Sequence, residues 1–266
     1  MIGAIIGDIV GSRFEWDNHR SKTFTFLSER CFFTDDSVMS LAVCEALLLV
    51  REQGGDLARA TVAAMQRIGR PYPDCGYGGM FGQWMYTDHP APYGSYGNGA
   101  AMRVSGVAYA ATTPAQVRTL SHAVTAVTHN HPEGIKGAEA AAMVTFLART
   151  GMPLTDVEAY IHRQYYDMDF TLDEIRADYV FNATCQGTVP QALKAAFVAT
   201  DFEDAIRNAV SIGGDSDTIA AIAGGVAEAA FGVPSAIRMR AMTFLDARLQ
   251  DILARFERVY PGKAAK

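Results

Sequence analysis

The sequence of 266 residues lacks a long uninterrupted hydrophobic run and lacks basic residues at its start. Glu45, Glu139 and Glu228 interrupt the longest apolar stretches, which are therefore shorter than a membrane span requires. The segment from Met1 to Asp8 is apolar, but it has no basic region of the kind that precedes a signal-peptide core. We therefore expect no membrane partner.

Cysteine is scarce, and charge of neither sign is clustered. The four cysteines, Cys31, Cys44, Cys75 and Cys185, form no Cys-x-x-Cys pair, which argues against a cysteine-based zinc site and favours a reducing cytoplasm. The net charge is −6. Nucleic acids are held by clustered Lys and Arg, so this acidic balance excludes a broad nucleic-acid-binding surface.

The chain also lacks a linker, a low-complexity tract and an internal repeat, so we predict a single domain over residues 1–266. Clear two-residue alternation is confined to one candidate strand, Lys22 to Leu27. Helical periodicity dominates, and the predicted class is all-α, a compact bundle. The predicted helices are 37–52, 57–68, 100–110, 114–127, 133–149, 189–199, 202–211, 218–231 and, as one helix or two, 236–259.

The stretch from Pro71 to Gly99 differs from the rest, because it is rich in both glycine and aromatic residues. Such a segment is not a continuous helix. Long irregular segments inside compact domains are usually functional or disordered. Its aromatic content favours an ordered loop that lines a pocket, and Tyr93 and Tyr96 are candidates to stack on a base.

Two acidic clusters stand at predicted helix starts: Thr34-Asp35-Asp36-Ser37 and Asp215-Ser216-Asp217-Thr218. One alternative is helix capping, for which Asp, Ser and Thr are favoured. A cap needs one oxygen, however, and adjacent carboxylates repel each other unless a counter-charge is present. If the clusters meet, four carboxylates and two hydroxyls suit Mg²⁺, Mn²⁺ or Ca²⁺, and they are enough for a pair of ions.

Three further segments are weaker signals. Asp8 and Glu15 are seven residues apart, about two helical turns, and could share a face or simply be exposed acids. Gly97-Asn98-Gly99 before Met102 is either an ordinary turn or a phosphate-binding helix start. The run from Thr128 to Glu133 contains His129 and His131; a polar pocket wall is favoured there over a zinc site, because no third ligand is evident.

Together and in this order, these pieces resemble the ADP-ribosylglycohydrolase family, which includes the dinitrogenase reductase-activating glycohydrolase. The resemblance covers nearly the whole chain. The segments that carry it are Gly7-Asp8 with Glu15, Thr34-Asp35-Asp36, Gly97-Asn98-Gly99 with Met102-Arg103, Thr128-His129, and Asp215-Ser216-Asp217-Thr218.

The resemblance implies an all-α orthogonal bundle whose cleft holds two Mg²⁺ or Mn²⁺ ions. It implies metal ligands at Thr34, Asp35, Asp36, Asp215, Asp217 and Thr218. It implies substrate contacts at Gly97, Asn98, Gly99, Met102 and His129. Glu15, Asp35 and Asp36 become the candidates for proton transfer, and Glu15 is alternatively a gate.

The implied reaction is hydrolysis of the C1″ glycosidic bond of ADP-ribose attached to a protein side chain, with release of ADP-ribose. Arginine is the first candidate linkage, although the acid nearest to the glycine loop on its N-terminal side is only Asp88. Serine-linked ADP-ribose, O-acetyl-ADP-ribose and an ADP-ribosylated nucleobase are alternatives. A protein that binds ADP-ribose without cleaving it, a structural protein and a phosphate-ester hydrolase are the competing functions. The oligomeric state is open, with a monomer favoured.

Overall fold

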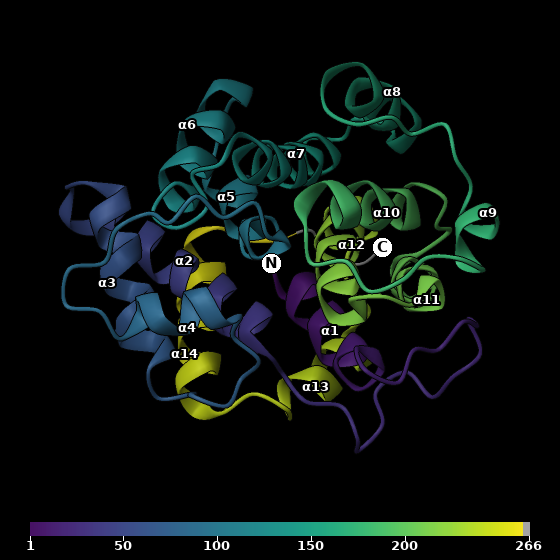
Figure 1. Ribbon diagram of the computed structural model, residues 1–266, viewed down its shortest axis with the longest axis horizontal. Coiled ribbons are helices and arrows are strands. Elements are labelled where there is room, and N and C mark those ends of the chain that lie inside the picture. Colours follow the sequence, from purple (N-terminus) through teal and green to yellow (C-terminus); the bar gives the residue numbers. More distant parts are fainter. Residues whose placement is uncertain (263–266) are drawn as a thin grey trace.

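The computed structural model describes residues 1–262, and within them it is built from helices without a β-strand, which confirms the all-α class (Figure 1). The predicted single domain includes residues 263–266, which lie outside the described part. The α-helices are α1 (Ile2–Gly11), α2 (Asp35–Gln53), α3 (Leu57–Gly69), α4 (Gly79–Met85), α5 (Ser105–Ala110), α6 (Pro114–Thr125), α7 (Pro132–Arg149), α8 (Leu154–Gln164), α9 (Leu172–Arg176), α10 (Cys185–Phe197), α11 (Phe202–Ile212), α12 (Ser216–Phe231), α13 (Ser235–Met242) and α14 (Ala247–Val259).

The centre of the fold is the pair α1 and α12, whose backbones touch. Every residue of α1 is buried, and its glycines at positions 3, 7 and 11 face α12. A Cβ atom on Gly7 would lie 1.9 Å from the carbonyl oxygen of Ala220, and one on Gly11 would lie 2.4 Å from that of Ser216. Small residues four apart lie on one helix face, so this stripe lets the two helices approach as closely as backbones can.

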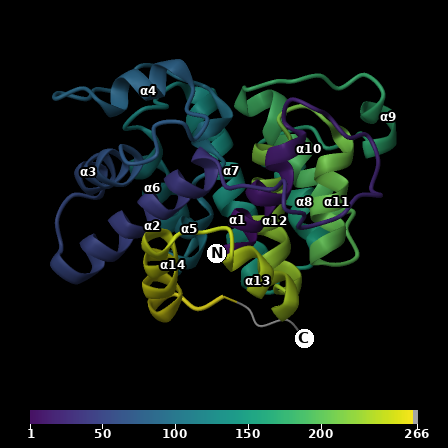
Figure 2. The same cartoon turned by 90° about the horizontal axis from the view of Figure 1, so that it is seen from below.

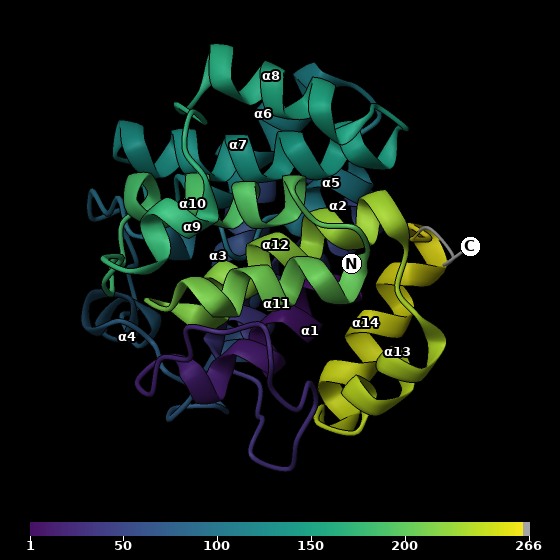
Figure 3. The same cartoon turned by 90° about the vertical axis from the view of Figure 1, so that its right-hand side faces the viewer.

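The other helices are arranged around this pair. Figure 3 shows α7, α10, α12 and α11 side by side with similar axis directions, while α14 runs across them. On the opposite side, α2 packs against α3 and α14 (Figure 2). The crossing directions are those of an orthogonal bundle, and the core extends through all of these interfaces.

Most predicted helices are confirmed, with shifts at their ends. The C-terminal segment forms two helices, α13 and α14. The predicted helix over 100–110 starts only at Ser105, after a separate 3₁₀ turn at Asn98–Ala100. The irregular segment 71–99 contains one short helix, α4. Periodicity did not single out α8 or α9, which are short and mostly half-exposed.

The predicted strand over 22–27 is wrong. Its backbone oxygens bind arginine side chains in place of a neighbouring strand: Arg207 Nη1 donates to the carbonyls of Lys22 and Phe24 at 2.8 and 2.9 Å. The Arg207 guanidinium also lies 4.8 Å from the centre of the Phe24 ring. The alternation in this segment therefore reflects two aromatic side chains packed under a guanidinium.

Among residues 1–262, no helix combines the length and apolarity needed to cross a membrane. The four cysteines are free thiols, and Cys31, Cys44 and Cys185 are buried.

Candidate metal centre and active site

The first acidic cluster is held in place by Asp8, a fully buried carboxylate on α1. Asp8 accepts hydrogen bonds from the backbone N–H and the hydroxyl of Thr34, at 3.0 and 2.7 Å. It also accepts bonds from the backbone N–H, at 3.1 Å, and the hydroxyl of Ser37. Asp8 therefore fixes the N-terminus of α2, where Thr34 is the N-cap. This arrangement leaves Asp35 and Asp36 free of the capping role.

The second cluster follows a turn that only glycine adopts easily. Gly213 and Gly214 have φ values of 79° and 74°, in the left-handed region. The Asp215 carboxylate makes no capping bond to α12, and Oδ2 instead accepts a 2.7 Å hydrogen bond from the amide of Asn98. The turn thus directs Asp215 toward the glycine loop.

The two acidic clusters meet. The hydroxyl of Thr218 donates to Oδ2 of Asp36 at 3.2 Å, which joins the start of α12 to the start of α2. The second oxygen of Asp36, Oδ1, is buried and has no hydrogen-bond partner among residues 1–262. Carboxylate oxygens of Glu15, Asp215 and Asp217 lie within 4.8 Å of one another. The two clusters, whose meeting the sequence leaves open, therefore converge on one centre.

The electrostatics of this centre show an unbalanced negative charge. Burial, followed by the charges of Asp8, Asp35 and Asp215, raises the pKa of Asp36 well above its ordinary value. Burial followed by the Asp215 and Asp36 charges does the same to the pKa of Asp217.

The same causes act on the two outer acids. Burial and the charges of Asp8 and Asp215 raise the pKa of Asp35 to about 8. Burial, Asp215 and Asp8 raise the pKa of Glu15 to about 7. Mutually repelling carboxylates with an orphaned oxygen fit a divalent cation, which would supply the missing positive charge.

A cavity of about 620 Å³ opens over these acids. Of the twelve site residues predicted from the sequence, all but Thr34 line this cavity. The Thr34 hydroxyl is bonded to Asp8, and Thr34 lines a neighbouring groove. The predicted residues that line the cavity are Glu15, Asp35, Asp36, Gly97, Asn98, Gly99, Met102, His129, Asp215, Asp217 and Thr218.

The glycine loop is attached to the start of α10. The backbone N–H of Asn98 donates to the carbonyl of Ala183 at 2.8 Å, and that of Cys185 donates to Tyr96 at 2.9 Å. The Asn98 amide also donates to the Thr188 hydroxyl at 3.1 Å. Asn98 therefore joins α10 to Asp215 and fixes the loop above the acidic centre.

The far wall of the cavity carries His129 and Arg103. Burial and the nearby Arg103 charge lower the pKa of His129 to about 2. His131 does not join His129: it caps α7, with Nδ1 accepting the N–H of Glu133 at 3.1 Å. This geometry favours the polar pocket wall over the zinc alternative.

Two exposed aromatic rings border the cavity. Trp16 and Phe181 stack with centroids 5.1 Å apart, and both line the cavity. Beyond Glu15 and Trp16 lies a second groove of about 960 Å³, whose lining includes Asp74. The two hollows thus share the Glu15–Trp16 segment.

Sequence reasoning did not place Asp8 or Arg103 among the site residues. From the sequence, Asp8 either shares a helix face with Glu15 or is an exposed acid, whereas in the structure it is buried and bonds to Thr34 and Ser37. The signal available in the sequence is its position as the single acid of an otherwise apolar helix. Arg103 is 1% exposed at the end of the glycine loop, and sequence alone gave no sign of its burial.

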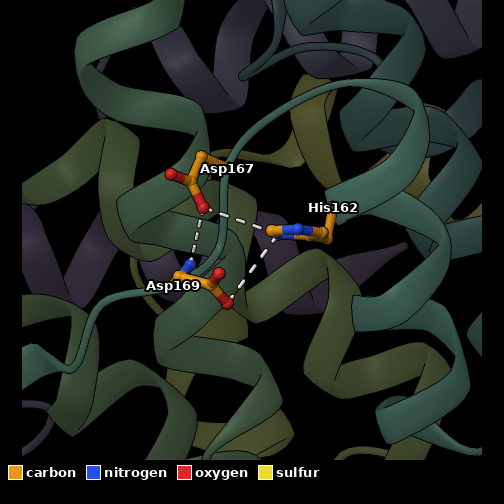
Figure 4. A group of neighbouring side chains, drawn as sticks. All are labelled: His162, Asp167 and Asp169. Atoms are coloured by element: carbon orange, nitrogen blue, oxygen red, sulfur yellow. Dashed lines mark hydrogen bonds and ion pairs between the residues drawn. The ribbon is translucent and has the colours of Figure 1, made fainter.

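A different acidic group lies on the surface, after α8. His162 Nδ1 is 3.5 Å from Asp167 and 3.9 Å from Asp169 (Figure 4). All three residues are exposed. The same Nδ1 already accepts the backbone N–H of Met168 at 3.2 Å, so its lone pair is engaged.

Comparison with known proteins identifies the family. A model of the ADP-ribosylglycohydrolase family matches residues 1–263 of this chain. The relatives include ADP-ribosylhydrolase ARH3 of Homo sapiens, which is 23% identical over 312 aligned positions that cover 88% of this chain and 84% of the human protein. ARH3 of Xenopus tropicalis is 28% identical over 177 positions, covering 57% of this chain and about half (49%) of that protein.

Among solved structures, a chain of an ADP-ribosylglycohydrolase-related protein complex is similar in fold. The TM-score is 0.66 at 23% identity, and the match covers 97% of this chain and 96% of that chain.

Proposed function

The chain belongs to the ADP-ribosylglycohydrolase family and is a glycosidic-bond hydrolase, and from this premise we propose that it cleaves the C1″ bond of ADP-ribose attached to a protein side chain. The reaction releases ADP-ribose and depends on two divalent ions, Mg²⁺ or Mn²⁺. One observation carries the proposal above the others: the hydrogen bond between Thr218 and Asp36, which brings both acidic clusters to one cavity.

The ions would be held by Asp35, Asp36, Asp215, Asp217 and Thr218. Asp36 supports this role, because its Oδ1 atom is buried without a partner and its surroundings are negative. Thr34 remains a predicted ligand, although its hydroxyl already donates to Asp8. Ions held there would supply Lewis-acid charge for orienting the ribose hydroxyls and for activating water.

The chain's own residues complete the site. Glu15 lies at the border of the cavity and the second groove, where it is suited to give a proton to the leaving group or take one from water. Without a bound cation, burial and the charges of Asp215 and Asp8 raise the pKa of this carboxyl to about 7. Charge that develops on the ribose during bond cleavage faces the carboxylates of Asp35 and Asp36.

The remainder of the substrate would lie along the other wall. Gly97, Asn98, Gly99 and Met102 would contact the ribose or diphosphate, and His129 would line the same wall. Tyr93 also lines the cavity, next to His129, and offers a ring face to a base.

Arginine is the first leaving group to test. The second groove adjoins the reaction centre at Glu15, and it also contains Asp74, an exposed carboxylate. Neither acid forms an ion pair with another described residue, and a guanidinium is the side chain that carboxylates recognise best. Asp88, considered from the sequence, lines neither hollow.

The test is a panel of ADP-ribose conjugates linked through arginine, serine, acetate and a nucleobase, each assayed with Mg²⁺, with Mn²⁺ and with chelator. We expect release of ADP-ribose from at least one conjugate, and its loss with chelator. Release of AMP would support a phosphate-ester hydrolase instead. ADP-ribose binding without turnover on the whole panel would support a binding protein, and activity unaffected by chelator would contradict the metal proposal.

A further inference from the structure

A buried triad, Arg103, Thr128 and His129, stands at the far wall of the cavity, which Arg103 and His129 line. Arg103 Nη2 donates to the Thr128 hydroxyl oxygen at 2.6 Å and lies 3.4 Å from Nδ1 of His129. The Thr128 hydroxyl is 2.7 Å from the same Nδ1. All three side chains are buried, with exposed fractions of 1%, 0% and 5%. These contacts determine which imidazole nitrogen carries the proton.

Arg103 cannot accept a hydrogen bond, because a guanidinium offers only N–H donors. The oxygen of Thr128 receives one of these donors, and its own proton has Nδ1 of His129 as the one acceptor recorded for it within residues 1–262. If Nδ1 carried the proton, the Thr128 oxygen would accept from both Arg103 and His129, and the buried hydroxyl proton would have no recorded acceptor. With the proton on Nε2, Nδ1 accepts the hydroxyl proton and every donor of this contact is paired.

The protonated nitrogen faces the glycine loop. A Cβ atom at Gly99 would lie 3.4 Å from Nε2 of His129, and one at Gly97 would lie 3.6 Å from it. Because both positions are glycine, no side chain covers this nitrogen from the loop. His129 and the two glycines all line the cavity.

We propose that Arg103, acting through Thr128, is a positioning residue that holds His129 in the neutral Nε2–H form, so that the ring donates one hydrogen bond to an oxygen of the bound ADP-ribose unit. Arg103 has this effect through its hydrogen bond to Thr128. The triad gives the wall opposite the acids a fixed donor for an oxygen-rich ligand. That the ligand is ADP-ribose rests on the proposed function. That His129 carries its proton on Nε2 does not.

The first experiment is long-range ¹H–¹⁵N NMR of the full chain labelled at histidine, with the His129 signal assigned by its loss in His129→Gln. We expect a neutral ring with the proton on Nε2, before and after addition of ADP-ribose. A proton on Nδ1, or a doubly protonated ring at neutral pH, would overturn the proposal even if the enzyme is active.

The second experiment varies the positioning residue. Arg103→Met removes the donors behind Nδ1, so we expect a mixture of the two neutral forms, whereas Arg103→Lys keeps a donor-only group and restores the Nε2–H form. ADP-ribose binding by calorimetry should weaken about fivefold in Arg103→Met, as expected for one hydrogen bond. In a His129→Gln background, whose amide supplies its own donor, Arg103→Met should cost no further affinity.

If Arg103→Met does not fold, Thr128→Val decides the question. It removes the bridging hydroxyl at nearly constant volume, and we expect about fivefold weaker ADP-ribose binding, with wild-type affinity kept by Thr128→Ser. Thr125→Val is the matched control, because the Thr125 hydroxyl is equally buried and has no hydrogen-bond partner. Wild-type affinity in Thr128→Val would overturn the proposal. If the wild-type protein has the Nε2–H ring but does not bind ADP-ribose, the proposed function is contradicted instead.

Discussion

Two groups of acidic side chains in this protein have similar composition but opposite surroundings. The surface group, His162 with Asp167 and Asp169, is exposed, and its imidazole lone pair is already used by a backbone N–H. The central group around Asp36 and Asp217 is buried, and it holds an oxygen without a partner. Composition alone would rank the histidine-containing group higher as a metal site.

The comparison favours the central group as the cation site, because its negative charge is uncompensated by the protein. The type of ligand atom alone would not make this distinction. Water already solvates the surface carboxylates, so an ion gains little by replacing it. At the centre, burial and repulsion have raised the carboxyl pKa values, and a cation would relieve both effects. Four variants or conditions test this contrast.

The largest effect should come from Gly7→Ala, which removes the support of the central group. The added methyl would meet the Ala220 backbone, so α1 and α12 must separate. We expect destabilisation by more than about 3 kcal/mol, above the usual range for overpacking, measured by urea unfolding. Gly82→Ala on α4 is the control, because within residues 1–262 its added Cβ would meet no atom within 4 Å apart from its chain neighbours and its own helix backbone. Equal stability of the two variants would disprove the close contact.

Asp217→Asn should abolish most activity while the fold persists. It keeps the side-chain shape but removes one buried charge. Loss of a residue that only hydrogen-bonds to a metal ligand costs up to about 100-fold, so loss of a direct ligand should lower kcat/KM by more than that. The control is Asp169→Asn in the surface group, which should retain wild-type kcat/KM. A matched loss in both variants, or full activity in Asp217→Asn, would refute the contrast.

Asp8→Asn should have a smaller effect, because Asp8 supports the centre from behind. An asparagine that keeps its oxygen toward the N–H groups of Thr34 and Ser37 would place its NH2 group where Oδ1 now accepts the Thr34 hydroxyl, and it would remove the charge. We expect metal affinity to fall about 10- to 100-fold in a Mn²⁺ titration. The exposed neighbour of the site, Asp17, supplies the control: Asp17→Asn should bind Mn²⁺ as the wild type does.

The smallest effect is a pH-dependent gain in melting temperature. The pKa of Asp35 rises from 3.8 in the unfolded chain to about 8 in the folded protein, so the metal-free protein loses stability as pH rises between about 4 and 8. Added Mn²⁺ or Mg²⁺ should therefore raise Tm more at pH 8 than at pH 5.5. At pH 8 the gain in Tm should be roughly 5 °C at a metal concentration a hundredfold above Kd. His162→Ala should show the same gain; an equal Tm gain at both pH values would argue against binding at the carboxylates.

Much of the architecture could be read from the sequence. Amphipathic or apolar periodicity located α2, α7, α11 and α12, because those helices bury a continuous face. The acidic clusters were predictable because two carboxylates exceed the need of a helix cap. Their meeting was not, since Asp36 and Thr218 are 182 positions apart and their helices come together through α1, which packs against both.

Other features depend on tertiary contacts that leave no local pattern. The alternation of Phe24 and Phe26 predicted a strand, but packing beneath Arg207 produces the same pattern. The role of Asp8 depends on four donors contributed by another helix. The burial of Arg103 follows from its partners Thr128 and His129, which come 25 and 26 positions later.

The close contact of α1 with α12 also sets the order of events during synthesis. A ribosome that adds about 5–20 residues per second needs roughly 10 to 40 s between completing α1 and completing α12. During that interval the first helix, buried on all sides in the finished protein, has only α2 of its main neighbours to pack against. Its glycine face stays uncovered until α12 is made, and the acidic centre is complete only then.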